Sequence, residues 1–387
     1  MKTVELFAGI GGFRIAADRL GFATLWANDI CPLASTVYRS QFGEREFHEG
    51  DIADLADSIP AHDLLTGGFP CQPFSSAGKK QGIQDPRGSL FEHIVETVAR
   101  HNPRFFVLEN VKRLLTMESG RHFATILASL AELNYMIEWR LLNAVDFGLA
   151  QNRQRVIIVG VRQSNASSRN DDISVRLAVP EELSQTTSRG KFSVSATSGH
   201  WPDIGSHGAR FPNWGLARKG RFTGCDPDRF LSAIPSVLLQ SVLEPDTPSE
   251  FDFTESTLGR LQNNVEVNRF VGGVEILSNQ GGGARMGYTI FGINGIAPTL
   301  TATPSRHYER YKIGDRYRRL TNVEYARLQG FPDDHCSSVS LYNQYGLYGN
   351  AVPPAMVEWV MRRLTSPGVP LRQMAARRRQ KELFIDA

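Results

Sequence analysis

The chain has 387 residues, 41% of them hydrophobic and 21% charged, a composition typical of a soluble globular protein that is long enough for two domains. Its net charge of +3 gives no overall excess of positive charge, so a nucleic-acid partner would need a local basic patch. The sequence has no long uncharged apolar stretch, which argues against a signal peptide or membrane span and favours the cytoplasm. Cys31, Cys71, Cys225 and Cys336 lie far apart without a CxxC pair, so we predict neither a metal site nor disulfides.

The N-terminal segment has the pattern of a Rossmann-like unit. Residues 3–8 predict a short buried strand, and Gly9-Ile10-Gly11-Gly12 leads from it into a helix over 13–20. Glycines let the backbone approach a ligand closely, and the helix N-terminus offers unpaired N–H groups. The third glycine of the dinucleotide-binding pattern is missing, so the loop alone does not identify its ligand.

Two acidic residues follow at predicted strand ends. A strand over 23–29 ends in Asp29, about 20 residues after the glycine loop, where α/β cofactor sites place a carboxylate for ribose hydroxyls. Asp29 suits equally the N-cap of a helix over 30–42. Asp51 suits either the amino group of an adenine or a plain turn.

Cys71 stands between Pro70 and Pro73, just after the apolar run 63–66. The prolines stiffen the backbone around the thiol, and a loop beyond a strand end is where α/β enzymes place reactive groups. An isolated cysteine is more often an inert apolar residue, but this placement favours a nucleophile. The polar, glycine-rich residues 78–88 that follow suit either a lid over a substrate or a solvated linker.

Further candidate catalytic residues lie at the ends of two more predicted strands. The buried run 105–108 leads directly into Glu109, a placement that is costly for a carboxylate without a partner or a function. Arg153 and Arg155 precede the apolar strand 156–161, and on an extended chain they lie on the same side. Both guanidinium groups could therefore point at one site, or simply be exposed.

The composition changes after Arg162. Residues 163 to 300 are rich in Ser, Asn, Gly and Thr and predict a linker followed by a smaller, irregular domain. The stretch 299–319 interleaves arginines with tyrosines and suits either a nucleic-acid backbone or a solvated face. A helix capped by Thr321 or Asn322 and ended by Gly330 is predicted next, and a last helix spans 355–364.

Taken together, these segments resemble the cytosine-5 DNA methyltransferases of bacterial restriction-modification systems. Eight blocks occur in the order typical of that family: 5–12 ELFAGIGG, 28–29 ND, 50–52 GDI, 68–75 GFPCQPFS, 109–111 ENV, 151–155 QNRQR, 319–321 RLT with 330–332 GFP, and 349–352 GNAV. The resemblance implies an α/β, Rossmann-like S-adenosylmethionine-dependent methyltransferase fold with a smaller, irregular target-recognition domain.

The resemblance also implies a mechanism. Cys71 would add to carbon-6 of a cytosine so that carbon-5 can accept the methyl group of S-adenosyl-L-methionine, leaving S-adenosyl-L-homocysteine. Glu109 would hold the N3 edge of the base, Arg155 would orient Glu109, and Arg153 would lie near the thiol and the target phosphate. The target base would be flipped out of duplex DNA.

The other site residues are carried over from the matching positions. Around the cofactor the resemblance implies Phe7, Ala8, Gly9, Gly11, Asp29, Ile30, Asp51, Ile52, Pro70, Leu90, Asn350 and Ala351. Ile30 stands where many members have a tryptophan that stacks on the adenine. For DNA we predict contacts from Gln72, Ser75, Lys79, Lys80, Arg87, Arg285, Thr299, Leu300, Arg306, Tyr308 and Arg310.

Four segments are expected. They are a catalytic and cofactor-binding domain at 1–163, a target-recognition domain at 164–317, a hinge at 318–339, and a C-terminal segment at 340–387 that returns to the catalytic domain. We further expect a monomer in the bacterial cytoplasm, associated with the nucleoid while acting, with no metal and with a cognate restriction endonuclease as a separate protein.

Three alternatives have different consequences. An RNA cytosine-5 methyltransferase of the tRNA-modifying branch would share this core, but the long recognition region favours duplex DNA. A nicotinamide dehydrogenase would leave Cys71, Glu109 and both arginines without a role. A catalytically inactive DNA-binding relative would not need every polar catalytic position, and all of them are present.

Overall fold

The structure is a computed structural model, and statements about it concern the residues that it describes. These are residues 1–69, 89–163, 174–178, 201–227, 237–259, 261, 264–280, 288–302, 309–365 and 369–370. Within those ranges no helix is both long and apolar enough to span a membrane.

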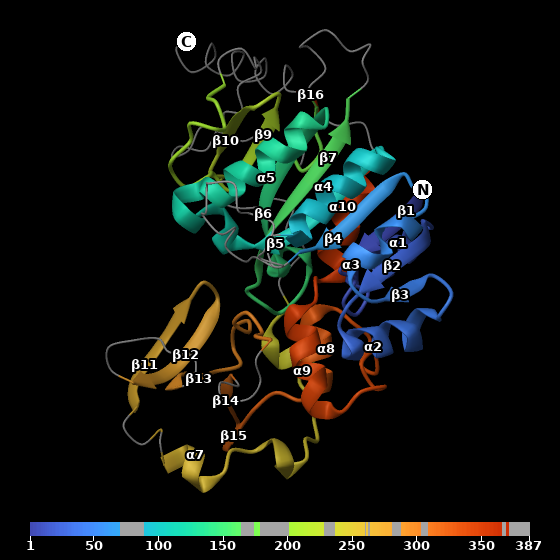
Figure 1. Cartoon of the computed structure of the whole chain (residues 1–387). Coiled ribbons are helices and arrows are strands. Elements are labelled where there is room, and N and C mark those ends of the chain that lie inside the picture. Colours follow the sequence, from blue (N-terminus) through green and yellow to red (C-terminus); the bar gives the residue numbers. More distant parts are fainter. Residues whose placement is uncertain are drawn as a thin grey trace, which may run out of the picture.

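The larger part of the molecule is built on a nine-stranded sheet in the order β10-β9-β6-β7-β5-β4-β1-β2-β3 (Figure 1). Its strands are β1 (Lys2–Leu6), β2 (Ala23–Asp29), β3 (Phe47–Glu49), β4 (Leu64–Gly68), β5 (Phe105–Val111), β6 (Tyr135–Asn143), β7 (Gln154–Arg162), β9 (Trp214–Arg218) and β10 (Arg221–Cys225). The five strands from β3 to β5 run parallel, and each strand from β7 to β10 is antiparallel to its neighbours. The predicted α/β, Rossmann-like fold is confirmed.

Helices cover both faces of this sheet. On one face lie α4 (Ser89–His101) and α5 (Arg121–Glu132), whose apolar residues, such as Ile94 and Leu127, are fully buried. On the other face α1 (Gly12–Arg19) packs beside α10 (Pro354–Leu364), with Phe13 and Val357 in a common core. The last α-helix of the described residues therefore stabilises the first through this common core.

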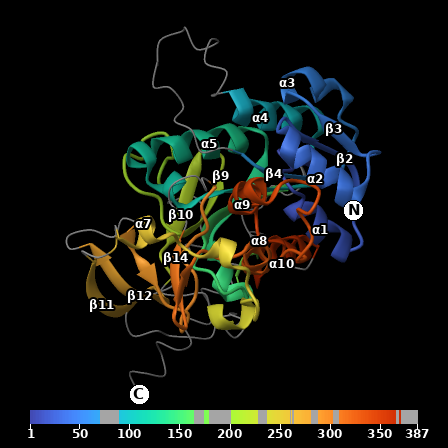
Figure 2. The ribbon, with the colours of Figure 1, turned by 90° about the horizontal axis from the view of Figure 1, so that it is seen from below.

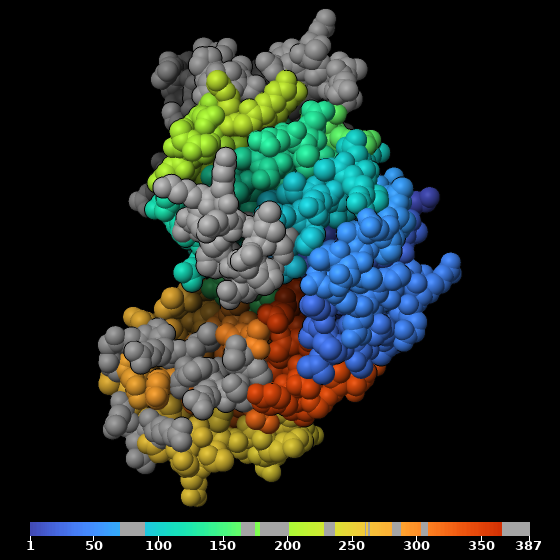
Figure 3. All heavy atoms as spheres, in the orientation of Figure 1, coloured from blue at the N-terminus to red at the C-terminus, as the bar shows by residue number. Residues whose placement is uncertain are grey.

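A second, smaller sheet lies apart from the first. It has the order β11-β12-β13-β14-β15 and comprises β11 (Asn264–Val271), β12 (Val274–Gln280), β13 (Ile290–Phe291), β14 (Arg310–Ile313) and β15 (Arg316–Arg318). The remaining elements are α2 (Pro32–Phe42), α3 (Ile52–Leu55), α7 (Glu255–Gly259), α8 (Asn322–Gln329), α9 (Leu341–Asn350), β8 (Ser174–Val175) and β16 (Val369–Pro370). Seen from below, α8 and α9 lie between the small sheet and the N-terminal helices (Figure 2), and the space-filling view is hollowed between the two parts (Figure 3).

Local chemistry explains the best-predicted helix. Thr321 accepts the Glu324 N–H while the Glu324 carboxylate accepts the Thr321 N–H, a capping box that starts α8. Gly330 ends the helix in the left-handed conformation, with φ 80°. Both predicted ends are confirmed.

Three expectations differ from the structure. The apolar spacing over 111–133 predicts a helix, whereas a regular helix begins only at Arg121, because Glu118 and Ser119 both have positive φ. Helix α9 was not predicted. Strands β9 and β10 fall within the predicted recognition domain, yet they extend the catalytic sheet through pairing with β6. The four domain boundaries themselves stay a prediction.

Candidate active site

Two cavities meet at one ion pair. Arg155 Nε lies 2.8 Å from Glu109 Oε1, and the two side chains are only 11% and 12% exposed. Glu109 lines a cavity of about 210 Å³ formed by the glycine loop, and Arg155 lines a cavity of about 390 Å³ between the two sheets. The two members of the ion pair therefore belong to the walls of two different cavities.

The ends of parallel strands position Glu109. Glu109 pairs in register with Gly68, the last residue of β4, and a Cβ on Gly68 would lie 3.2 Å from Glu109 Oε2. A larger residue at this position would crowd the carboxylate, which would have to shift by a few tenths of an ångström. Asn110 points the other way and donates from Nδ2 to the Phe69 carbonyl at 3.0 Å, which fixes the chain leaving β4. No role was predicted for Asn110, although its position next to Glu109 in the block 109–111 could have indicated one.

The smaller cavity is lined by the glycine loop and the ends of β2 and α9. Asp29 accepts the Gly9 N–H at Oδ2 (2.7 Å) and the Cys31 N–H at Oδ1 (2.8 Å). Burial raises the pKa of this carboxyl, while the backbone N–H groups oppose the shift. Each oxygen of Asp29 thus accepts one backbone hydrogen bond, which ties the glycine loop to the start of α2. The N-cap residue of α2 is Cys31, so the alternative prediction of Asp29 as this N-cap does not hold.

Backbone conformation shapes this loop. Phe7 has φ 54°, uncommon for a bulky residue and a form of strain that clusters at ligand sites. Gly11 has φ 84°, and a Cβ there would lie 2.3 Å from the Phe42 ring. Gly11 is therefore required for packing against α2, and it does not line the cavity.

The predicted cofactor residues divide into two groups. Those that line the cavity are Phe7, Ala8, Gly9, Asp29, Asn350 and Ala351. Those that do not are Gly11, Ile30, Asp51, Ile52 and Leu90. Asp51 is exposed and caps α3 by accepting the Ala53 N–H, Ile52 is buried, and Leu90, in the first turn of α4, packs against the core. Ile30 is 63% exposed, which leaves a large apolar surface next to Asp29.

Arg153 is surrounded by backbone carbonyls, and Cys71, near which it was predicted to lie, is outside the described residues. Its guanidinium donates to the carbonyls of Gly349 (2.8 Å), Ala351 (2.8 Å) and Leu300 (3.3 Å), and the residue is 1% exposed. Burial, and after it the charge of Arg155, lower the pKa of this group. A side chain so enclosed braces the segments around it and presents no face to a phosphate.

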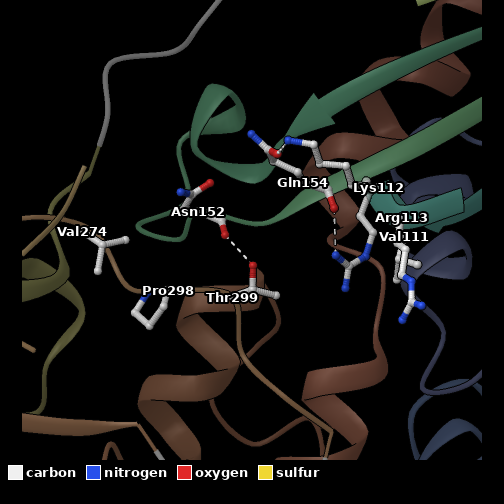
Figure 4. Close-up of a pocket in the computed structure, with 9 residues that line it drawn as sticks. Val111, Lys112, Arg113, Asn152, Gln154, Val274, Pro298 and Thr299 are labelled. Atoms are coloured by element: carbon white, nitrogen blue, oxygen red, sulfur yellow. Dashed lines mark hydrogen bonds between the residues drawn. The ribbon is translucent and has the colours of Figure 1, made fainter. Parts of the chain in front are cut away.

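The larger cavity lies between the sheets (Figure 4). Thr299 donates from Oγ1 to the Asn152 carbonyl at 2.6 Å, and the Leu300 N–H donates to Gln151 Oε1 at 3.1 Å. Thr299 thus lies in this cavity, whereas Leu300 is buried behind it. Lys112 and Arg113 also line it, and Lys112 donates to Gln154 Oε1 at 2.8 Å. These two cations follow ENV directly, but they were not among the predicted site residues.

The Arg/Tyr-rich stretch is mostly structural where it is described. Arg318 forms a buried ion pair with Glu324, with nitrogen to oxygen distances of 2.7 and 2.8 Å. Arg316 pairs with Asp252, and the Arg319 guanidinium lies over the Phe251 ring. Arg318 is thus enclosed in its ion pair, whereas contacts of the other arginines of this stretch with phosphates stay a prediction. Arg310 is half-buried, with its guanidinium over Phe253.

Several predicted residues lie outside the described ranges. They are Pro70, Cys71, Gln72, Ser75, Lys79, Lys80, Arg87, Arg285, Arg306 and Tyr308.

Comparison with known proteins identifies the family. The family model for C-5 cytosine-specific DNA methylases matches residues 1–214 and 231–366. The chain is 31% identical over 376 residues to the Type II methyltransferase M.DsaV of Dactylococcopsis salina, across 95% of this chain and 86% of that protein. It is 47% identical over 160 residues to M.NgoBI of Neisseria gonorrhoeae, across 41% and 50%.

A solved structure supports the fold. The crystal structure of the S. pombe Dnmt2 methyltransferase matches 95% of this chain and 99% of its own, with a TM-score of 0.62 at 18% identity. Fold and family model agree, and the predicted resemblance is confirmed. The chain belongs to the C-5 cytosine-specific DNA methylases.

Proposed function

We propose that this protein transfers a methyl group from S-adenosyl-L-methionine to carbon-5 of a cytosine flipped out of a specific duplex DNA sequence, as the modifying enzyme of a restriction-modification system. The observation that carries the proposal is the Glu109–Arg155 pair, which lies between a cavity formed by the glycine loop and a cationic cavity between the sheets. Methyl transfer needs two substrates bound at neighbouring sites, and this pair belongs to both cavities.

The glycine-loop cavity suits a nucleoside with a charged amino-acid tail. Asp29 keeps lone pairs on both oxygens for ribose hydroxyls beyond its two backbone bonds. The exposed face of Ile30, next to Asp29, offers aliphatic packing to a base, and Asn350 is among the residues that line the cavity. The cofactor would supply an electrophilic methyl group when bound.

The remaining chemistry belongs to the chain itself. Glu109 would hold the amino and N3 edge of the cytosine, and Arg155 would keep that carboxylate in place. The Cys71 thiolate would form a bond to carbon-6, and the electron pair released toward carbon-5 would take up the methyl group. Loss of the carbon-5 proton and departure of the thiolate restore the ring. Cys71 comes three positions after Gly68, which pairs with Glu109.

The cavity between the sheets suits a flipped nucleotide. Cytosine carbon-6 is inaccessible within a stacked duplex, so the base must leave the helix. Lys112 and Arg113 beside Arg155 provide positive charge for the phosphates of the same strand, and Thr299 provides a hydroxyl. A monomeric state, a metal-free reaction, a cytoplasmic location and a separate endonuclease stay predictions.

Methyl-transfer assays with purified protein test this proposal. Label from S-adenosyl-L-methionine should enter duplex DNA and not tRNA, and Cys71→Ser should abolish transfer while cofactor and DNA binding persist. Duplex DNA with 5-fluorocytosine at the target should trap a covalent complex, since that ring has no carbon-5 proton to lose. Transfer to tRNA alone would favour the RNA-modifying branch, and turnover by Cys71→Ser would exclude the covalent mechanism.

A further inference from the structure

Asn152 is one of several residues that link the two parts of the molecule, and it does so at the edge of the larger cavity. Asn152 precedes β7 and touches the small domain through its backbone and its side chain. Its N–H donates to the Ala297 carbonyl at 2.8 Å, and the Ala297 N–H returns a bond to the Ala150 carbonyl at 2.7 Å. The carbonyl of Asn152 accepts the Thr299 hydroxyl, as Figure 4 shows.

The Asn152 side chain reaches a different segment. Asn143 Nδ2 donates to Asn152 Oδ1 at 2.9 Å, which leaves Asn152 Nδ2 directed away from β6. Asn152 Nδ2 then donates to the Gly272 carbonyl at 3.2 Å. Gly272 is in the turn between β11 and β12, so a bond from the catalytic side holds the tip of the β11–β12 hairpin.

The turn is built for this close approach. Gly272 has φ 56°, and a Cβ there would lie 2.8 Å from Asn152 Nδ2. A side chain at this position would push the amide away. The neighbouring Gly273 carbonyl accepts the Ile296 N–H at 2.9 Å, so the turn is tied to the same segment that pairs with Asn152.

The position of this hairpin affects the cavity. Val274, the first residue of β12, lines it together with Thr299 and Arg155. A shift of the turn therefore changes the distance between the small sheet and the Glu109–Arg155 pair.

We propose that Asn152 is a positioning residue that fixes the β11–β12 hairpin relative to the Glu109–Arg155 pair, and so sets how DNA bound to the small domain meets the catalytic pair. The proposal rests on the proposed function for its effect on DNA, but the link itself is independent of activity. Asn152 belongs to the family block 151–155, but no role in the predicted chemistry was given to it.

Variants of the two contact partners test the link. Asn152→Ala and Gly272→Ala should each raise the KM for a target duplex about 3- to 10-fold, the range of one hydrogen bond, with kcat changed by less than about twofold. The double variant should be no worse than the more impaired single variant, because both changes remove one contact. Gly314→Ala is the matched control, since Gly314 has φ 60° in the β14–β15 turn, and a Cβ there would meet no atom of the described residues within 4 Å.

Hydrogen exchange supplies a readout that does not require activity. Amides of 264–280 and 290–300 should exchange faster in Asn152→Ala than in wild type, and Gly314→Ala should leave them unchanged. Unchanged exchange in Asn152→Ala, or KM effects that multiply in the double variant, would overturn the proposed link. A wild-type protein without methyl transfer would contradict the proposed function, and the exchange result would still decide the link.

Discussion

The substitution Arg153→Met tests whether Arg153 stabilises the fold or acts on DNA. Methionine keeps most of the apolar stem and removes the guanidinium, so the carbonyls of Leu300, Gly349 and Ala351 lose their donor. A hydrogen bond to a charged group contributes about 1.5 to 3 kcal/mol. With two short bonds and one longer bond, we expect a loss of about 4 kcal/mol in the free energy of unfolding.

The corresponding shift in melting temperature follows from chain length. Unfolding entropy is about 2.1 cal/mol/K per residue, or about 0.8 kcal/mol/K for 387 residues that unfold together. A loss of about 4 kcal/mol then lowers the Tm by about 5 °C. Calorimetry of Arg153→Met against wild type measures it.

An exposed arginine is the control. Arg113→Ala should weaken DNA binding with the Tm within about 1 °C of wild type, because surface substitutions change stability by less than about 0.5 kcal/mol. If Arg153→Met kept the wild-type Tm and still lost methyl transfer, Arg153 would act on substrate, and the inference from its buried carbonyl contacts would be refuted.

Three more substitutions test other parts of the site. Glu109→Gln should lower the rate of methyl transfer about 10²- to 10⁴-fold with cofactor affinity retained in calorimetry, and a normal rate would remove Glu109 from the mechanism. Gly11→Ala should reduce cofactor affinity and stability, because the added Cβ would collide with the Phe42 ring. The double variant with Phe42→Ala should recover part of both losses. Unchanged affinity and stability in Gly11→Ala would contradict this packing argument. Burial raises the pKa of Glu5 from 4.5 to about 8, so the folded state keeps a proton that the unfolded state releases. Stability should therefore fall as pH rises from about 4.5 to 8, and the Tm advantage of Glu5→Gln over wild type should grow with pH; a constant difference would show that Glu5 does not titrate in this window.

The strands of the parallel sheet could be predicted because their signal is local. Four apolar residues before Glu109 and an acid at the end of β2 identify buried strands and their carboxyl ends without knowledge of the neighbours. The parallel arrangement then brings those ends to one edge, and Asp29 and Glu109 accordingly line one cavity.

The elements that were not predicted depend on distant partners. Helix α9 contains Gly346 and Gly349, which weaken a helical pattern, but a Cβ on Gly349 would lie 2.2 Å from the Thr301 carbonyl, so the glycine is needed for packing. Similarly, Gly215 in β9 is typical of a turn residue in sequence, whereas the Trp139 ring occupies the space of its side chain. Tertiary contacts overrode local preference at both positions.

The arginines show the same limit for function. In the sequence, Arg153, Arg318 and Arg319 cannot be distinguished from arginines that bind phosphate. Arg318 pairs with Glu324, six residues later, and Arg153 donates to carbonyls about 150 and 200 residues away. Only the three-dimensional structure distinguishes a buried arginine with a structural role from an exposed arginine that is free to bind phosphate.

Bisulfite sequencing of DNA from cells that express the protein tests the central claim most directly. We predict 5-methylcytosine at one fixed position of a short recurring sequence with the wild-type chain, and none with Cys71→Ser at equal expression. Unmodified DNA with the wild-type chain, or equal methylation with Cys71→Ser, would contradict the proposed covalent methyl transfer.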